Sequence, residues 1–454
     1  MRGLVRRCRR VRAIVLVGAV AAGLVGGLPG GAVHAADAAS AASAAERAVQ
    51  PQPVPTYRAA EGARTIEGKL TTAEAPLLDA GAVYSDTIAP GERFYRLNLD
   101  DRSSVYVSAV VQPPPEAKVG YSDGIEVEII TTEGRRCQSN SGRADFGYDP
   151  VPLSAVAVRR LEEDAECQGQ GTYFAKVTRT AAKDSDQRPW PVELRLQREP
   201  GLGTGSAPTT APSVWPSASP ALPGTDPVAR TGGTGFNDAR ALDSGVWRDD
   251  LRPGQTRYYR VPLDWGQQLG LSAEISAARM TKQYGSASNG LSVSLYSPYR
   301  GLVDSKDTSY DGKQAGVTLP KTAPVAYENR FSDATEVRGA RLAGWYYVAV
   351  TLGGKVAEFT EDATPVPLTV RVQVSGSPAK APAYKESLSA AGFGVGADER
   401  AAAKGGLTAP EADAAAENHS AMRIVAGAGF GTGTLLLLVL GGWILLARRG
   451  GETA

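Results

Sequence analysis

Histidine is nearly absent from this chain: its 454 residues include only two, His34 and His419. The first lies at the end of an apolar N-terminal segment and the second just before an apolar C-terminal one, so the regions expected to fold contain none. This excludes Ser-His-Asp and Cys-His catalysis and histidine-ligated zinc or iron sites in those regions. No GxSxG, Walker A or Rossmann glycine motif occurs in a suitable strand-to-helix context either.

The N-terminus is typical of an export signal. Six arginines and no acid lie within residues 1–12, an apolar run follows over 13–28, and Pro29-Gly30-Gly31 ends it. Small residues come next, as a signal peptidase requires. We expect a signal peptide over residues 1–35, cleaved at Ala35 or Ala36 after Sec export. The alternative is an uncleaved N-terminal anchor.

A second apolar segment lies near the C-terminus. Residues 424–447 form a 24-residue stretch without charge, followed directly by Arg448 and Arg449. About 20 apolar residues span a bilayer, and positive flanks stay in the cytoplasm. We therefore predict one transmembrane helix over 424–447, a cytoplasmic tail over 448–454, and a cell-membrane location with the N-terminus outside. The alternative is a buried core helix.

The charge balance of the predicted external part is mildly acidic. Residues 36–422 hold 40 Lys and Arg against 47 Asp and Glu, a net charge of about −7. They show no basic stripe, which argues against a nucleic-acid partner.

Cysteine is also scarce. Cys8 lies in the predicted signal, which leaves Cys137 and Cys167 in the exported part. An even pair in an exported protein predicts a disulfide, here closing a 31-residue loop and worth about 3–4 kcal/mol. A metal or redox site would need a CxxC spacing or further ligands, and neither is present.

The middle of the chain repeats itself. The segment VYSDTIAPGERFYRLNLD at 83–100 matches VWRDDLRPGQTRYYRVPLD at 246–264. Three further pairs follow in the same order: 123–130 with 289–296, 171–177 with 344–350, and 192–197 with 368–373. Four ordered matches indicate two copies of one domain.

The matched blocks have the pattern of strands. Ile125, Val127 and Ile129 alternate with glutamates, which is the period of a half-buried strand. We predict an all-β protein with two tandem antiparallel β-sandwiches of jelly-roll type, over 60–200 and 230–376. The two should be independent folding units with corresponding buried positions. Those pairs are Leu99/Leu263, Val107/Leu271, Val127/Val293 and Val177/Val350.

The second copy resembles bacterial pre-peptidase C-terminal-like modules, which are small β-sandwiches found beside secreted proteases and in surface proteins. The residues carrying the resemblance are Pro253, Gly254, Tyr258, Tyr259, Leu263, Gly266, Leu269, Leu271, Leu291, Val293, Leu295, Gly344, Tyr346, Tyr347 and Val348. The first copy departs from the pattern at Pro113-Pro114-Pro115 and at its cysteines. With both membrane signals, the whole chain is similar to actinobacterial single-pass surface proteins. The resemblance implies a fold and carries no catalytic residue.

Three segments are predicted to lie outside the folded domains. Residues 36–59 are rich in Ala and Pro and are expected to be disordered. Residues 201–229 form a Pro/Ser/Thr-rich linker in which Trp215 is expected to dock on a neighbouring domain. Residues 377–423 lack periodicity, which predicts a flexible stalk.

Two features bear on ligands. Asp304, Asp307 and Asp311 are a weak candidate for a calcium loop, although their spacing is not that of an EF-hand and acidic turn residues are commonly just solvated. Aromatic pairs such as Tyr258/Tyr259 suit either a carbohydrate-stacking platform or the core. Neighbours on a strand face opposite sides, so we favour the core for at least one of each pair.

We therefore expect a non-enzymatic, membrane-anchored surface protein without a cofactor. Its duplicated sandwiches would bind or scaffold an extracellular protein or a cell-wall polymer. The alternatives are a carbohydrate-binding protein, or a hydrolase that uses only carboxylates or an accessory subunit of one.

Overall fold

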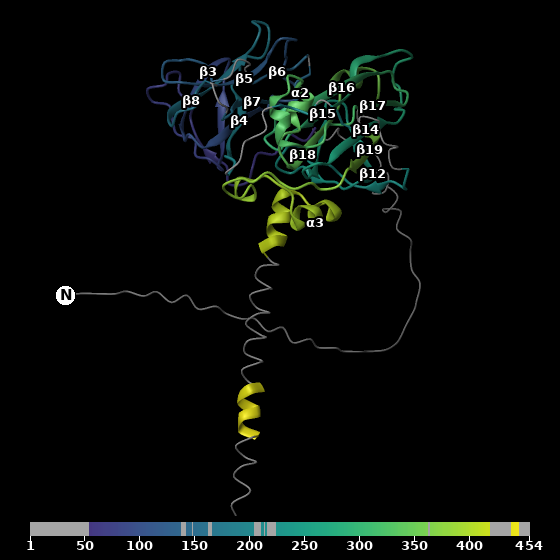
Figure 1. The fold of residues 1–454 in the computed structure, drawn as a ribbon. Coiled ribbons are helices and arrows are strands. Elements are labelled where there is room, and N and C mark those ends of the chain that lie inside the picture. The colour runs from purple at the N-terminus through teal and green to yellow at the C-terminus, as the bar shows by residue number, and fades with distance from the viewer. Residues whose placement is uncertain are drawn as a thin grey trace, which may run out of the picture. The chain divides into compact units, whose positions relative to one another are not determined.

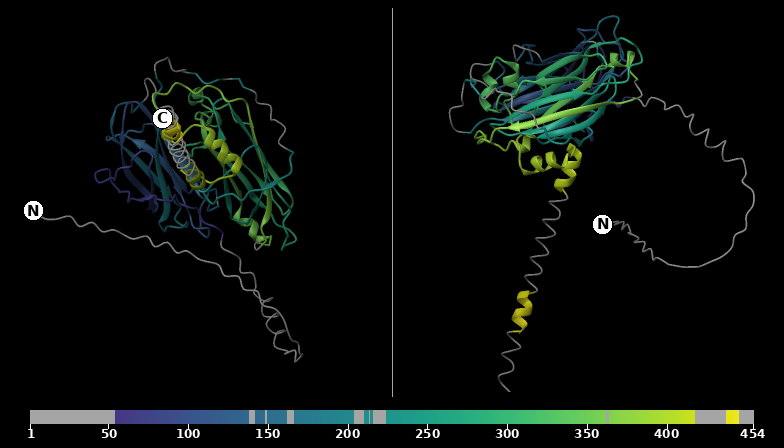
Figure 2. Two further views of the ribbon diagram at one scale, coloured as in Figure 1. Left: turned by 90° about the horizontal axis from the view of Figure 1, so that it is seen from below. Right: turned by 90° about the vertical axis from the view of Figure 1, so that its right-hand side faces the viewer.

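The computed structural model describes residues 54–137, 142–147, 149–161, 166–203, 210–212, 214–215, 224–361, 364–417 and 437–444. Most of the regular structure is strand, with a smaller share of helix (Figures 1 and 2). The all-β prediction is therefore confirmed.

The first sandwich consists of two sheets, with strands in the order β1-β2-β9-β4-β7 and β3-β8-β5-β6. Its strands are purple to blue in Figure 1. They are β1 (Arg64–Thr65), β2 (Val83–Ile88), β3 (Gly91–Leu99), β4 (Ser103–Val111), β5 (Gly124–Ile130), β6 (Gly142–Asp145), β7 (Leu153–Arg159), β8 (Gly171–Thr180) and β9 (Trp190–Pro200).

The second sandwich has the orders β10-β12-β19-β14-β17 and β11-β13-β18-β15-β16. Its strands are β10 (Val228–Ala229), β11 (Arg240–Ala241), β12 (Gly245–Leu251), β13 (Thr256–Leu263), β14 (Gln268–Ile275), β15 (Ala287–Tyr296), β16 (Leu302–Tyr310), β17 (Ala315–Leu319), β18 (Gly344–Leu352) and β19 (Val366–Ser375). Its short helices are η1 (Tyr327–Phe331), α2 (Thr335–Gly339) and η2 (Gly354–Glu358). Outside the short edge strands β1, β10 and β11, the two sandwiches share one strand order, that of an eight-stranded jelly roll.

The registers match as well as the order. Val107 lies opposite Leu196 in the first sandwich, and Leu271 lies opposite Val372 in the second. All eight residues of the four predicted pairs are buried, none more than 4% exposed. The prediction of corresponding buried positions is confirmed.

A buried polar contact is duplicated too. The Tyr95 hydroxyl donates to Asp86 Oδ2 over 2.8 Å, and the Tyr259 hydroxyl donates to Asp249 Oδ2 over 2.7 Å. In each copy a glycine N–H bonds the same carboxylate oxygen, and a Cβ on that glycine would lie within 3 Å of the tyrosine ring. The glycine is required because the ring leaves no room for a side chain.

The connecting segments partly contradict the expectations. Over 377–417 the chain is folded against the sandwiches: Phe393 is 2% exposed, and α3 (Ala397–Gly405) buries Ala402 and Ala403. The flexible-stalk prediction is therefore wrong for these residues, because short apolar patches without long periodicity still find partners. Trp215 packs against Val337 and Ala340, so its predicted docking is confirmed.

The predicted membrane and signal segments fall mainly outside the described residues. Ala35, Ala36, Arg448 and Arg449 all lie there. Of the span 424–447 only 437–444 are described, and they are helical. Within the described part of the chain, no helix is both long and apolar enough to cross a membrane.

Candidate functional site

The two sandwiches meet through the outward face of β9. Residues 193, 195, 197 and 199 point to one side of this strand, opposite to the core positions 192, 194 and 196. The side chains at 193, 197 and 199 are nevertheless buried, because the second sandwich covers this face. The polar residues of β9 therefore serve an interface between the sandwiches.

Glu193 forms the first buried ion pair of this interface. Its carboxylate accepts hydrogen bonds from Arg300 Nη1 at 2.5 Å and Asn237 Nδ2 at 2.7 Å, both from the second sandwich. The Ala60 N–H adds a third bond at 3.0 Å. Burial raises the pKa of Glu193, but Arg300 and the hydrogen bonds outweigh burial, so the pKa lies below its usual value.

Glu199 forms the second buried ion pair. Arg330 Nη2 donates to its Oε1 at 2.6 Å, and the Tyr106 hydroxyl donates to its Oε2 at 2.5 Å. The Tyr384 hydroxyl bonds Oε1 at 2.8 Å. Burial raises the pKa of Glu199, and the charge of Arg330 with these hydrogen bonds brings it below its usual value.

Aromatic side chains complete the interface. Phe236 lies edge-on to Tyr258, Tyr296 and Tyr347, with ring centroids 5.1–5.2 Å away, and Val110 of the first sandwich belongs to the same cluster. Tyr258 and Tyr347 are the members of their aromatic pairs that point away from the core of the second sandwich, and both are buried in this interface. The core interpretation is therefore confirmed for Tyr259 and Tyr346, and the outward positions offer no open stacking platform.

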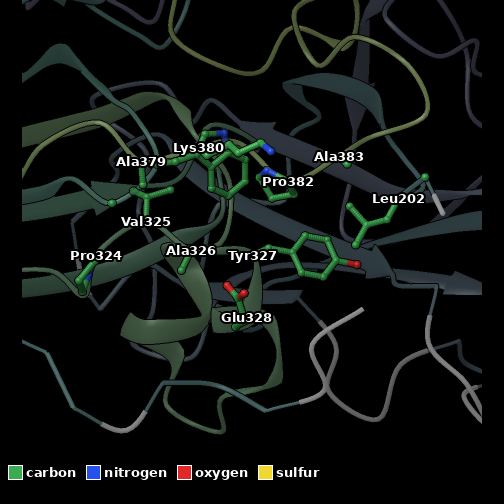
Figure 3. Close-up of a pocket in the computed structure, with 13 residues that line it drawn as sticks. Leu202, Pro324, Val325, Ala326, Tyr327, Glu328, Ala379, Lys380, Pro382 and Ala383 are labelled. Atoms are coloured by element: carbon green, nitrogen blue, oxygen red, sulfur yellow. The ribbon is translucent and has the colours of Figure 1, made fainter. Parts of the chain in front are cut away.

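Beside this interface lies an apolar cavity of about 400 Å³, which we name the Trp265 pocket (Figure 3). Three stretches of the chain form its walls: the start of the linker, the second sandwich, and the C-terminal segment. The lining residues are Leu202, Gly203, Trp265, Gly266, Pro324, Val325, Ala326, Tyr327, Glu328, Ala379, Lys380, Pro382 and Ala383.

The turn between β13 and β14 positions Trp265. Asp264 Oδ1 accepts the Trp265 N–H at 2.9 Å, and Gly266 follows with a φ of +77°. A Cβ at Gly266 would lie 2.9 Å from the Ala379 Cβ, so this turn requires glycine for its conformation and for close approach. The Ala379 N–H in turn bonds the Trp265 carbonyl at 2.7 Å. The C-terminal segment is thereby held against the pocket.

Tyr384 connects the pocket to the second ion pair. Its ring centroid lies 6.4 Å from that of Trp265 and 6.2 Å from that of Tyr327, while its hydroxyl bonds Glu199. The Arg330 guanidinium lies 3.4 Å from the Tyr327 ring centroid. The pocket wall is therefore in direct contact with the interface between the sandwiches.

The pocket carries only two charged side chains. Lys380 and Glu328 lie on opposite sides of it, as Figure 3 shows. The remaining walls are aromatic, aliphatic, proline or glycine. Such a surface suits an apolar group with few polar contacts and supplies no catalytic pair.

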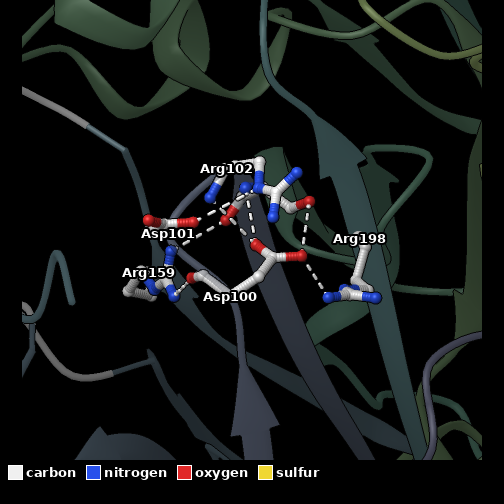
Figure 4. Close-up of polar contacts among 6 residues, drawn as sticks. Asp100, Asp101, Arg102, Arg159 and Arg198 are labelled. Carbon is white, nitrogen blue, oxygen red and sulfur yellow. Dashed lines mark hydrogen bonds and ion pairs between the residues drawn. The ribbon is translucent and has the colours of Figure 1, made fainter. Parts of the chain in front are cut away.

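Asp100 and Asp101 are adjacent carboxylates surrounded by arginines (Figure 4). Asp100 accepts the Ser103 N–H at 2.8 Å and pairs with Arg198, which holds the β3–β4 turn. Burial raises the pKa of Asp100, but hydrogen bonds from the turn and Arg198 bring it below its usual value. These contacts explain the cluster as a structural turn.

The calcium candidate does not assemble. Asp304 and Asp307 lie three residues apart on β16 and so face opposite sides of the strand, while Asp311 pairs with Lys313 at 3.2 Å. The described residues contain no group of three His, Cys, Asp or Glu side chains able to hold a metal ion.

The predicted disulfide is confirmed. Cys137 and Cys167 are bonded, and both pack against the core of the first sandwich.

Sequence reasoning missed the Trp265 pocket. Its walls come from the start of the linker, from a turn and η1 of the second sandwich, and from the segment interpreted as a stalk, none of which has a periodic pattern. The one available signal was the Trp-Gly dipeptide at 265–266, which directly follows the repeated block 246–264.

Comparisons with known proteins add little. No family model matches the chain, and no curated protein matches it. Among solved structures, the pre-peptidase C-terminal domain of Bacillus anthracis collagenase is 13% identical over 27% of this chain and 95% of that one, with a TM-score of 0.17. The CBM22-1-CBM22-2 tandem domain of Paenibacillus barcinonensis Xyn10C is 14% identical over 70% of this chain and 100% of that one, with a TM-score of 0.19. Scores this low carry no argument about function.

Proposed function

We propose that this chain is a non-enzymatic binding protein of the cell surface whose ligand site is the Trp265 pocket. The observation that carries the proposal is a preformed apolar cavity of about 400 Å³, formed by the start of the linker, the second sandwich and the C-terminal segment. Pockets of about 300–1,000 Å³ with mainly apolar walls and few polar groups are typical of small-molecule sites.

The walls favour an apolar segment of a polypeptide over a sugar. Stacking of a sugar needs an exposed ring with hydrogen-bonding side chains around it, but Trp265 is only 4% exposed. The two charges, Lys380 and Glu328, lie on opposite sides and suit the backbone or charged neighbours of a bound peptide. A carbohydrate-binding or accessory role in a secreted hydrolase is the second candidate, because Tyr327 offers one aromatic wall.

Anchoring in a membrane is part of the proposal and rests on the sequence. The uncharged segment 424–447 and the two arginines after it support one crossing with the sandwiches outside. Protease added to intact protoplasts should then remove nearly the whole mature protein. Cleavage of a C-terminal tag from outside would show the opposite orientation.

The ligand class is tested by binding. The full-length protein, purified in a neutral detergent, is applied to an array of apolar peptides and to an array of neutral glycans. We expect saturable binding to a subset of the peptides. Binding to glycans alone would favour the second candidate, and binding to neither array would contradict the proposed site.

Two variants locate the binding. Ala383 lines the pocket and is itself exposed, so Ala383→Trp should fill the mouth without removing a packing contact. Tyr327→Ala removes one wall. Each should weaken binding about tenfold or more. Tyr284→Ala is the matched control, because Tyr284 is 81% exposed and lies outside the pocket lining.

A further inference from the structure

A second cavity lies between the two sandwiches, separate from the Trp265 pocket, and has a volume of about 330 Å³. One wall comes from β6 and β7 of the first sandwich, and the other from the β15–β16 loop and α2 of the second. We name it the Arg341 cavity. Its lining includes the arginines 143, 338 and 341 and no carboxylate.

Arg341 is the unusual member. Its side chain is buried, at 3% exposed, and its guanidinium carbon lies 5.1 Å from the Tyr106 ring centroid and 4.7 Å from that of Tyr299. These two rings stack on each other with centroids 4.4 Å apart. The aromatic faces stabilise a cation, but they cannot accept the in-plane N–H bonds of a guanidinium.

The guanidinium lacks a hydrogen-bond acceptor in the described part of the chain. Arg341 Nε is buried without a partner there, and Arg341 forms no salt bridge with the described carboxylates. Buried charges are normally paired, because transfer from water costs far more than aromatic contacts return. The other two arginines that the second sandwich buries at this interface obey the rule: Arg300 pairs with Glu193 and Arg330 with Glu199.

The carboxylate whose charge acts on Arg341, that of Glu199, already has other partners. Glu199 already accepts bonds from Arg330, from the Tyr106 hydroxyl and from the Tyr384 hydroxyl, which occupy both of its oxygens. Arg341 is therefore a buried cation that lines the cavity and, unlike Arg300 and Arg330, has no carboxylate partner.

Arg338 and Arg143, the two further arginines that line the Arg341 cavity, add positive charge to its walls. Arg338 donates to the Ser332 and Asp333 carbonyls and to Thr335 Oγ1, all neutral acceptors, so its charge is not neutralised by a direct bond. Arg143 pairs with Asp145 at 2.6 Å and contributes less. Planar guanidinium groups bind carboxylate and phosphate oxygens with two parallel bonds.

We propose that the Arg341 cavity binds an oxyanion, the carboxylate or phosphate group of a ligand, against the guanidinium of Arg341 with Arg338 beside it. The cavity is larger than a bare ion, so the group belongs to a small molecule or to one unit of a polymer. This site is independent of the apolar Trp265 pocket and does not rest on the function proposed for that pocket.

The test measures anion binding by the full-length protein in neutral detergent. Sodium phosphate and sodium glucuronate are titrated at constant ionic strength maintained with sodium chloride, with glucose as the neutral control, and the melting temperature is recorded. A ligand of the folded state raises the melting temperature saturably. We expect a saturable rise with phosphate, with glucuronate or with both, and none with glucose. A response to one probe alone identifies the phosphate or the carboxylate source.

Arg341→Gln should abolish the rise, and Arg338→Gln should weaken the apparent affinity several-fold. The second variant keeps the test decisive if the first fails to fold, because Arg338 is only partly buried. Arg248→Gln is the control, because Arg248 is exposed on β12. Without anion, Arg341→Gln should lower the melting temperature little, since it removes an unpaired charge. An equal anion response in the wild type and both variants, or no response in the wild type, would overturn the proposal.

Discussion

Replacing Glu193 by glutamine should destabilise both sandwiches together. The substitution keeps the shape of the side chain but removes the negative charge that faces Arg300, whose side chain is 2% exposed. Arg300 would then be a buried cation without a counter-ion. Breaking a buried pair in this way costs about 3–5 kcal/mol.

The size of the effect decides between coupled and independent sandwiches. For one cooperative unit of both sandwiches, about 320–360 residues, a loss of about 3–5 kcal/mol corresponds to a fall in melting temperature of about 4–7 °C. Independent domains would each keep their own cores, and the loss of an interface contact would leave both transitions in place. Coupled domains would unfold in one transition that moves to lower temperature.

Differential scanning calorimetry of the full-length protein, with hydrogen exchange of β9 and β18 followed by mass spectrometry, separates these outcomes. We expect one transition in the wild type, lowered in Glu193→Gln, with protection lost in both strands at once. Glu193→Met with Arg300→Met should restore much of the loss, because an apolar pair leaves no unpaired charge. Glu92→Gln is the control: its partner Lys176 is 3.4 Å away at the surface, and the change should cost less than about 1 kcal/mol.

The reasoning is refuted if Glu193→Gln melts within about 2 °C of the wild type. It is also refuted if only β9 loses protection, since the interface would then not couple the two folds.

The remaining predictions use other parts of the fold. The pKa values of Glu193 and Glu199 lie below the usual value of 4.5. Their contribution to stability is therefore present above about pH 4.5 and should be lost as the pH falls through the folded-state pKa values. Acid unfolding followed by fluorescence would show this loss. Cys137→Ser should cost about 3–4 kcal/mol in urea denaturation, whereas the unreduced wild type should react with no thiol reagent when folded. Leu263→Ala should cost about 2–4 kcal/mol, because Leu263 is fully buried, and a loss below 1 kcal/mol would contradict the core assignment.

Much of the fold was predictable from the sequence. Alternating apolar residues in ordered, duplicated blocks determine which positions face a core, and burial of pairs such as Val127 and Val293 follows from that pattern. The disulfide was predictable for a different reason, because the chain holds only two cysteines after the segment expected to be an export signal.

The interface was not predictable in the same way. Glu193 and Glu199 occupy the outward positions of an alternating strand, where polar residues ordinarily meet water. Only the second sandwich makes them buried, and a period-2 pattern does not distinguish solvent from a neighbouring domain. The expectation of independent domains arose from this ambiguity, and the buried ion pairs argue against it.

The Trp265 pocket escaped for a related reason. Its walls are three loops and segments distant in sequence, joined by backbone bonds such as that from the Gly203 N–H to the Ala383 carbonyl at 2.6 Å. Loops carry no periodic signal, and the composition of residues 377–417 indicates flexibility more than packing.

The most direct test of the proposed binding function is a photo-crosslinking amino acid placed at position 327 in the protein on living cells. The same amino acid at position 284 is the control, on an exposed surface away from the pocket. The account predicts a covalent adduct with a polypeptide at position 327 and none at position 284. Adding the peptides found on the array before irradiation should reduce the yield of the adduct. The same adducts at both positions, or none at 327, would contradict it.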